Sequence, residues 1–118
     1  MRKIPHPIPY QGSKRSLAPI IGNYVPSNID VWFEPFAGSA AMSLWLMAHN
    51  PPQKIVLGDS LEALTELWRG IIMRPEVVAS QYRRLWSGQL NADAGYFNYF
   101  RSRFNVSRDP VELLYLMC

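Results

Sequence analysis

The sequence is poor in cysteine, in histidine and in long apolar runs. Its single cysteine, Cys118, excludes an internal disulfide framework and a cysteine-based zinc site, and it fits a reducing compartment. Its two histidines, His6 and His49, have no second ligand at helical spacing, so we expect surface residues and no metal. No apolar run approaches the roughly 20 residues that span a bilayer, and the N-terminal segment lacks the apolar stretch of a signal peptide. These absences predict a cytoplasmic protein with no membrane or metal partner.

The composition is that of a packed protein with a mild excess of positive charge. The 118 residues suit one small domain or part of a larger one, and 48% of them are apolar. The net charge of +3 permits an anionic partner. Ordinary scatter of charge explains it equally well.

The first 30 residues predict an arm and a short helix. Three prolines within residues 1–9 favour an extended course. A short helix follows, for which Pro19 is tolerable in the first turn. We expect this helix to carry its large apolar side chains inward: Leu17, Ile20 and Ile21.

Strand and helix patterns alternate over residues 31–73. Apolar runs at 31–36 and 54–59 predict strands, and helical spacing predicts helices at 39–48 and 61–73. This order predicts an α/β fold with a doubly wound parallel sheet. The first strand is apolar on both faces except for Glu34, which is typical of a central strand.

The remaining residues, 75–118, predict helices alone, at 76–86, 93–104 and 110–118. The last begins with Asp109 as N-cap and Pro110 at the first helical position. Its apolar residues run to Cys118 without an evident cover, notably Leu113, Leu114, Leu116 and Met117. We therefore expect a chain that is cut short or completed by another chain.

The turn after the first strand is the strongest candidate site. Gly38 lacks a Cβ, so the backbone there can approach a ligand closely. The backbone N–H groups of Ser39, Ala40 and Ala41 would lie at a helix N-terminus, which attracts a carboxylate. Glu34 suits an ammonium group, and S-adenosyl-L-methionine carries both groups. A dinucleotide-binding turn would contain three glycines, so a lone glycine argues against NAD. The alternative to a cofactor site is a plain strand–helix turn with a surface glutamate.

Asp59 closes the second predicted strand. A carboxylate at this position can accept hydrogen bonds from both hydroxyls of a ribose. Its alternative role is the N-cap of the following helix, for which Ser60 competes. The spacing of one strand–helix unit from Gly38 favours the ribose role.

Two further features carry weaker signals. Lys14 follows a glycine turn at Gly12 and could bind an anion, although the P-loop pattern is absent, and Tyr10 could stack on a base or pack in the core. Arginines and aromatic rings interleave in the helical half, which suits nucleic acid, but helix-end cations and core rings are the alternative. The arginines are Arg69, Arg74, Arg83, Arg84, Arg101, Arg103 and Arg108, and the rings are Tyr82, Tyr96, Phe97, Tyr99 and Phe100.

Four segments in order resemble the Dam-type, α-class DNA adenine-N6 methyltransferases. PYQGSKRSLAPII is similar to the family's first cofactor motif, with Tyr10, Gly12 and Lys14 at its aromatic, glycine and lysine positions. FEPFAGSAAMSLWL is similar to its Glu-Pro-Phe-x-Gly-x-Gly segment, with Ala40 in place of the second glycine. IVLGDSLEALTELWRGI and YFNYFRSRFNVSRDPVELLYLM are similar to its second strand with acid and to its Tyr-x-x-x-Arg-x-x-Phe-Asn stretch.

The resemblance implies a Rossmann-like class I methyltransferase fold that binds S-adenosyl-L-methionine and acts on duplex DNA, as in restriction-modification. Residues 1–74 would form the cofactor part, and residues 75–118 would begin the DNA-recognition region. The implied cofactor residues are Tyr10, Gly12, Lys14, Glu34, Phe36, Gly38, Ser39 and Asp59.

The family's catalytic Asp-Pro-Pro-Tyr is absent from these residues. Asp109–Pro110 begins similarly but lies in a helical region without the second proline or the aromatic. We therefore expect no catalytic residue here, an inactive isolated chain, and a second polypeptide that carries the motif or a truncated product. A non-catalytic interaction protein that keeps the fold and a small-molecule methyltransferase are the alternatives.

Overall fold

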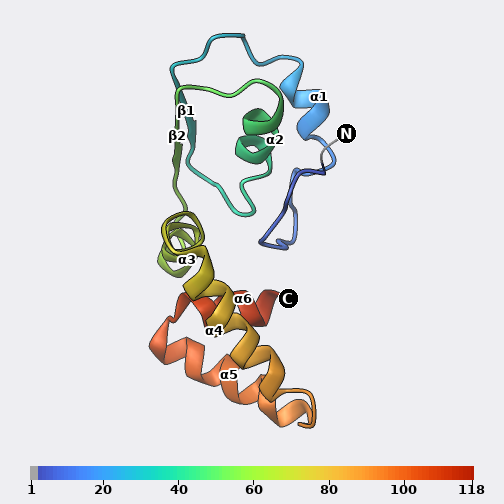
Figure 1. The fold of residues 1–118 in the computed structure, drawn as a ribbon, viewed down its shortest axis with the longest axis vertical. Coiled ribbons are helices and arrows are strands. Elements are labelled where there is room, and N and C mark those ends of the chain that lie inside the picture. Colours follow the sequence, from blue (N-terminus) through green and yellow to red (C-terminus); the bar gives the residue numbers. More distant parts are fainter. Residues whose placement is uncertain (1–2) are drawn as a thin grey trace. The chain divides into compact units, whose positions relative to one another are not determined.

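The computed structural model describes residues 3–118, with helices and strands in mixed order (Figure 1). By their internal contacts the residues form two compact units, of which one ends at Ser60 and the other spans Leu61–Cys118. The elements are α1 (Ala18–Gly22), β1 (Val31–Glu34), α2 (Ala41–His49), β2 (Lys54–Leu57), α3 (Glu62–Met73), α4 (Pro75–Gly88), α5 (Ala94–Ser107) and α6 (Pro110–Met117). No helix within residues 3–118 is long and apolar enough to cross a membrane.

The first unit contains a parallel pair of strands, as the alternating pattern predicts. Strand β1 pairs with β2 in a register that joins Val31 to Lys54 and Glu34 to Leu57. Residues 3–9 of the predicted arm form no helix or strand, and Ile8 from this arm is buried; the first two residues lie outside the described part. The structure therefore confirms an α/β arrangement with a small parallel sheet.

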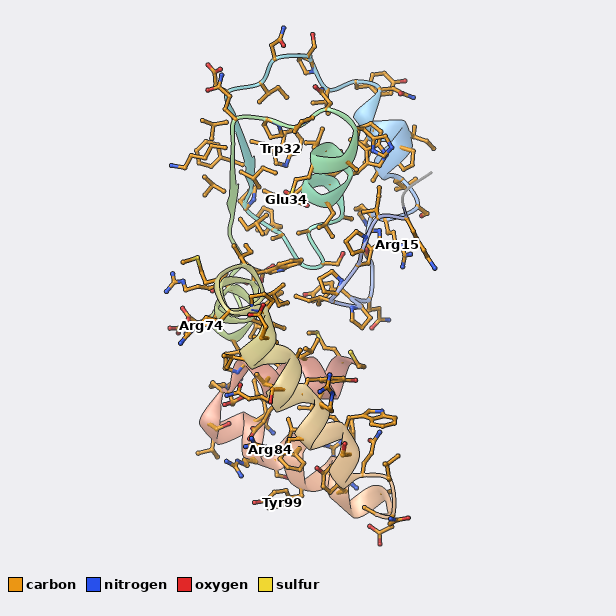
Figure 2. All side chains as sticks on the ribbon, viewed as in Figure 1. Arg15, Trp32, Glu34, Arg74, Arg84 and Tyr99 are labelled. Atoms are coloured by element: carbon orange, nitrogen blue, oxygen red, sulfur yellow. The ribbon has the colours of Figure 1, made fainter. Side chains whose placement is uncertain are left out.

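Only one face of this sheet is covered in the described residues. Trp32 and Glu34 lie between β1 and α2 (Figure 2), and both side chains are half-buried. On the other face, Phe33 is 67% exposed and Val31 is also exposed. Within residues 3–118, strand β1 pairs with β2 alone. The central position predicted for β1 is therefore not observed in this part of the chain. Parallel strands are normally covered on both faces, and a two-stranded sheet is marginal by itself.

Helix α1 packs on α2 through its smallest residues. Its buried residues are Ala18 and Gly22, one turn apart, and Gly22 lies against the ring of Trp45 on α2. The predicted inward side chains of Leu17, Ile20 and Ile21 are instead exposed, so that prediction was wrong. The reason is steric, because the close approach of the Trp45 ring leaves no room for a larger residue on the packed face.

The second unit is built around α6, which packs against α3, α4 and α5. Leu113 and Leu114 are buried, so the expectation that this helix lacks a cover was wrong for these two residues. Tyr115 is also buried, and the ring of Phe100 meets it edge-on with 5.8 Å between centroids. Some of the interleaved aromatic residues are therefore core rings, whereas Tyr99 is exposed.

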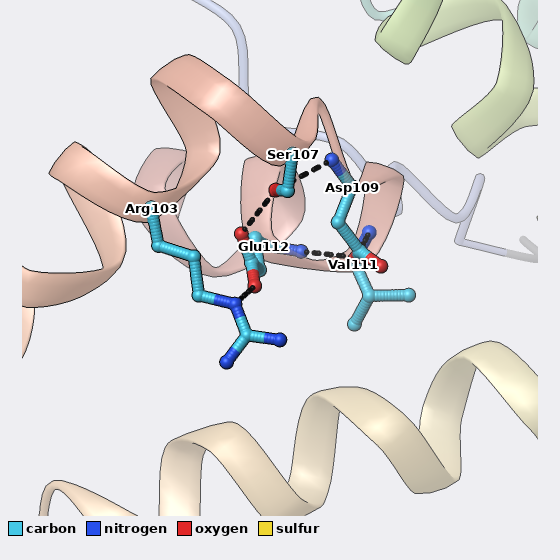
Figure 3. Close-up of polar contacts among 5 residues, drawn as sticks. All are labelled: Arg103, Ser107, Asp109, Val111 and Glu112. Atoms are coloured by element: carbon cyan, nitrogen blue, oxygen red, sulfur yellow. Dashed lines mark hydrogen bonds and ion pairs between the residues drawn. The ribbon is translucent and has the colours of Figure 1, made fainter.

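A buried carboxylate closes the corner between α5 and α6 (Figure 3). Glu112 is almost fully buried; its Oε1 forms an ion pair with Arg103 Nε at 2.8 Å, and its Oε2 accepts a hydrogen bond from the Ser107 hydroxyl at 2.9 Å. Asp109 caps α6 as predicted, because its Oδ1 accepts from the backbone N–H groups of Val111 and Glu112. A buried charge with these partners is satisfied, and it fixes how α5 turns into α6.

Two glycines of the first unit give a matched pair of stability tests. A Cβ at position 22 would overlap the Trp45 ring, 2.7 Å from Cε3, whereas one at position 58 would meet Pro35 at an ordinary 3.6 Å. We expect Gly22→Ala to lower the free energy of unfolding by about 1–3 kcal/mol and Gly58→Ala to change it by less than about 1 kcal/mol. Urea denaturation of both variants measures this. Equal stability of the two variants would contradict the packing of α1 on α2.

Candidate functional site

The turn between β1 and α2 is built from residues with left-handed backbone. Gly38 has φ +51°, and Ala40, the N-cap of α2, has φ +53°. Glycine adopts this region freely, whereas a methyl-bearing residue is strained there by roughly 1 kcal/mol. The left-handed φ of Ala40 explains physically why a glycine would suit this position. The Ala40 N–H donates to the Ala37 carbonyl at 2.6 Å, so this predicted anion donor is already engaged inside the turn.

The end of β2 is tied to this turn by three hydrogen bonds. The Gly38 N–H donates to Asp59 Oδ2 at 3.1 Å. The Ala37 N–H donates to the Gly58 carbonyl at 2.8 Å, and the Gly58 N–H donates to the Glu34 carbonyl at 2.9 Å. The structure therefore brings together the glycine and the acid that the sequence analysis paired, although they lie 21 residues apart.

The first predicted motif joins the same place. A Cβ added to Gly38 would lie 3.1 Å from Cδ1 of the Tyr10 ring, so the missing side chain makes room for this tyrosine. The hydroxyl oxygens of Ser13 and Ser39 are 2.7 Å apart. Gly12 has φ +78°, which a glycine turn requires. Three predicted segments thus meet around Gly38.

Lys14 and Phe36 face away from these internal contacts. Lys14 Nζ donates to the Gly12 carbonyl at 3.2 Å in an exposed position, and Phe36 is 85% exposed beside the turn. Tyr10 is partly exposed as well. The site therefore offers an exposed cation and two accessible aromatic rings next to a half-buried carboxylate, that of Asp59.

Glu34 has a role that the sequence analysis did not anticipate. Its Oε2 accepts from both the backbone N–H and the hydroxyl of Ser43 in the first turn of α2. Ala40 has no side-chain oxygen to cap this helix, so the glutamate supplies the missing acceptor from the neighbouring strand. Ser43 was missed because a cap that crosses from strand to helix leaves no local sequence signal. These bonds compete with the predicted ammonium contact of Glu34.

The histidines do not add a metal site. No group of three or more His, Cys, Asp or Glu side chains within residues 3–118 could hold a metal ion. His49 stacks on Trp45 with 4.3 Å between ring centroids and is exposed as expected. His6 is half-buried, and its Nδ1 finds no hydrogen-bond partner in the described residues. Burial, and then the charge of Arg15, lowers the pKa of His6, so it stays neutral at pH 7.

The cap of α2 can be tested by separating its two hydrogen bonds. Glu34→Ala removes both bonds to Ser43, and we expect the free energy of unfolding to fall by about 1–2 kcal/mol. Ser43→Ala keeps the backbone bond, so it should cost less, at most about 1 kcal/mol. Thermal and urea denaturation of the two variants give the comparison. If the Glu34→Ala variant is as stable as the parent, the cap contributes little to stability. The Glu34 carboxylate of the parent would then be available for a ligand.

A family model matches most of the chain. The family model described as D12 class N6 adenine-specific DNA methyltransferase matches residues 10–117, which is almost the whole chain. No curated protein matches the sequence. The matched range begins at Tyr10 and includes the turn, Asp59 and the α5–α6 corner.

Proposed function

Since this chain belongs to the D12 class N6 adenine-specific DNA methyltransferase family, we propose that it binds S-adenosyl-L-methionine for methyl transfer to adenine N6 in duplex DNA. One observation carries the proposal. Tyr10, Gly38 and Asp59 come from three separate segments and meet at the carboxyl ends of two parallel strands. In open α/β sheets, ligands bind at this edge.

The donor set of the site fits the nucleoside half of this cofactor. A carboxylate accepts up to about four hydrogen bonds, and the Gly38 N–H supplies one of those that Asp59 accepts. We assign the ribose hydroxyls to Asp59 and an aromatic contact with the base to Phe36 or Tyr10, whose rings are accessible. Lys14, exposed on the glycine turn at Gly12, is assigned to the carboxylate of the methionine part.

The ammonium group is the part of the ligand that fits least well. Glu34 was predicted to hold it, but Oε2 of this residue caps α2 through Ser43. The carboxylate has a second oxygen, so Glu34 can serve only if it keeps the cap and binds with Oε1. Ser39 shares its hydroxyl contact with Ser13, and we assign it to the wall of the same site.

The chemistry divides between holding the methyl donor and activating the acceptor. When bound, the cofactor supplies a methyl group on a positively charged sulfur. The residues of this chain bind and orient it. The adenine amino group is a weak nucleophile, and its nitrogen lies inside the duplex until the base is flipped. The acceptor groups that the family uses for this step, in Asp-Pro-Pro-Tyr, are absent from the 118 residues.

Asp109 does not replace the missing motif. Its carboxylate caps α6 through Val111 and Glu112, so it has a structural task at the start of a helix and does not follow a strand. We therefore propose that the acceptor-side residues come from a polypeptide segment outside these 118 residues, on a partner or on a longer product. Residues 1–74 then form the cofactor part of a Rossmann-like sheet, and residues 75–118 begin the DNA-recognition region.

The cofactor assignment is tested at Asp59. We expect Asp59→Ala to weaken S-adenosyl-L-methionine binding about ten- to hundred-fold, because a charge-assisted pair of hydrogen bonds is lost. Asp59→Asn keeps an oxygen that can accept from the Gly38 N–H but loses the charge. We therefore expect this variant to bind S-adenosyl-L-methionine weakly while its fold stays nearly intact. Isothermal titration calorimetry measures both variants. Asp30→Ala is the control, because Asp30 is an exposed acid of the same unit that bonds Gln53.

Two calorimetric results would contradict the assignment. If Asp59→Asn binds as tightly as the parent, Asp59 only closes the turn. If the parent itself does not bind S-adenosyl-L-methionine, the non-catalytic interaction protein becomes the better reading of this chain.

The proposal that this chain holds the cofactor and another segment activates the adenine predicts the methyltransferase activity of the isolated chain. The purified 118-residue chain should transfer no tritiated methyl group to duplex DNA. A polypeptide that carries the family's Asp-Pro-Pro-Tyr segment should restore transfer when it is added. Methyl transfer by the chain alone would show that a residue assigned here to structure activates the adenine.

A further inference from the structure

Two serine hydroxyls join the segment before α1 to the turn between β1 and α2. The Oγ atoms of Ser13 and Ser39 are 2.7 Å apart, although the two residues are separated by 26 positions in the sequence. Ser39 is 4% exposed, and Ser13 is half-buried. A buried hydroxyl is unfavourable unless it finds a hydrogen-bond partner. The serine pair is therefore a specific contact between two segments of the candidate site.

The Ser13 hydroxyl also fixes the backbone of its own turn. Its Oγ accepts a hydrogen bond from the Arg15 N–H at 3.3 Å, which is the local pattern of a serine turn. The Ser13 N–H donates to the Tyr10 carbonyl at 3.1 Å and so closes the turn that contains Gly12. A hydroxyl has one donor and two acceptor sites, so a single Ser13 side chain can bond both Arg15 and Ser39.

Lys14 is held between these contacts. It stands in the chain between Ser13, which contacts Ser39, and Arg15, whose N–H bonds the Ser13 hydroxyl. The Lys14 carbonyl accepts from the Ala18 N–H at 2.8 Å, where the chain enters α1. The ammonium group, by contrast, is exposed and bonds only a carbonyl of its own turn among the contacts found in residues 3–118. The backbone of this lysine is thus fixed while its charge remains accessible.

Apolar contacts also hold this part of the chain, but they are less directional. The Tyr10 ring lies 3.1 Å from the position that a Cβ on Gly38 would occupy, and Ile8 is 1% exposed. Apolar burial is non-directional, whereas a hydrogen bond depends on both distance and angle. The serine pair therefore supplies a directional contact that sets where Lys14 lies relative to the turn.

We propose that the pair of Ser13 and Ser39 is a positioning contact that holds Lys14 at the turn, so that the site selects ligands with an amino-acid tail over plain nucleosides. This inference rests on the proposed function, in which Lys14 receives the carboxylate of the methionine part and Asp59 receives the ribose. Lysine is a point charge on a flexible stem, so its attraction to a carboxylate depends on where its backbone is fixed. Neither serine has to touch the ligand in this role.

The two halves of the ligand depend on the serine pair to different degrees. The tail would meet the ammonium group of Lys14, which belongs to the segment that the pair holds. The ribose would meet Asp59, which follows β2 and accepts from the Gly38 N–H. Loss of the pair therefore displaces the lysine and leaves the bond between Gly38 and Asp59 in place. A contact that only stabilised the fold would affect both halves of the ligand alike.

The test compares two ligands on the 118-residue chain by isothermal titration calorimetry. One is S-adenosyl-L-methionine, and the other is methylthioadenosine, which keeps the nucleoside and the sulfur but lacks the amino-acid tail. We expect Ser13→Ala and Ser39→Ala each to weaken binding of S-adenosyl-L-methionine about three- to ten-fold, the effect of one hydrogen bond. Binding of methylthioadenosine should stay at the parent level. The double variant should bind no more weakly than the weaker single variant, because both substitutions remove the same contact.

Ser16→Ala is the matched control, because Ser16 is an exposed serine of the same segment, and this variant should bind both ligands as the parent does. The inference is overturned if Ser13→Ala keeps the parent affinity for S-adenosyl-L-methionine, or if both ligands lose affinity equally. It is also overturned if the single effects add in the double variant, or if the parent binds both ligands equally tightly. In all of these cases the parent still binds S-adenosyl-L-methionine, and the proposed function stands. A parent that binds neither ligand overturns the proposed function and this inference with it.

Discussion

The hydrogen bond from the Gly38 N–H to Asp59 is the interaction on which the candidate site depends. It joins the turn after β1 to the end of β2, and Tyr10 packs against the same glycine. Because each of these groups comes from a different segment, none of them forms the site alone. The carboxylate of Asp59 closes the turn, and under the proposed function it would also receive the ribose. A ligand would thus bind to a place that the fold has already ordered.

The second unit depends on a comparable polar constraint. Glu112 is a buried charge, which is costly unless partners satisfy it, and Arg103 and Ser107 do so. This contact draws one arginine of α5 inward. Arg103 is thereby paired, whereas Arg101 of the same helix remains exposed.

The family and the chemistry of the chain lead to the same division of labour. Under the proposed function the residues present hold the methyl donor, and the family's Asp-Pro-Pro-Tyr, which would activate the adenine amino group, is absent from them. The exposed face of the sheet at Val31 and Phe33 agrees with this division, because parallel strands are normally covered on both faces.

The sequence by itself determined the order of the elements, the parallel pairing of β1 with β2, the Asp109 cap and the pairing of Gly38 with Asp59. These follow from local signals, namely hydrophobic periodicity, proline and glycine positions, and the spacing of one strand–helix unit. Only the tertiary structure decided the inward face of α1 and the cap that Glu34 provides to Ser43. Both features depend on which side chains of other elements lie nearby in the folded chain. A local sequence pattern does not contain that information.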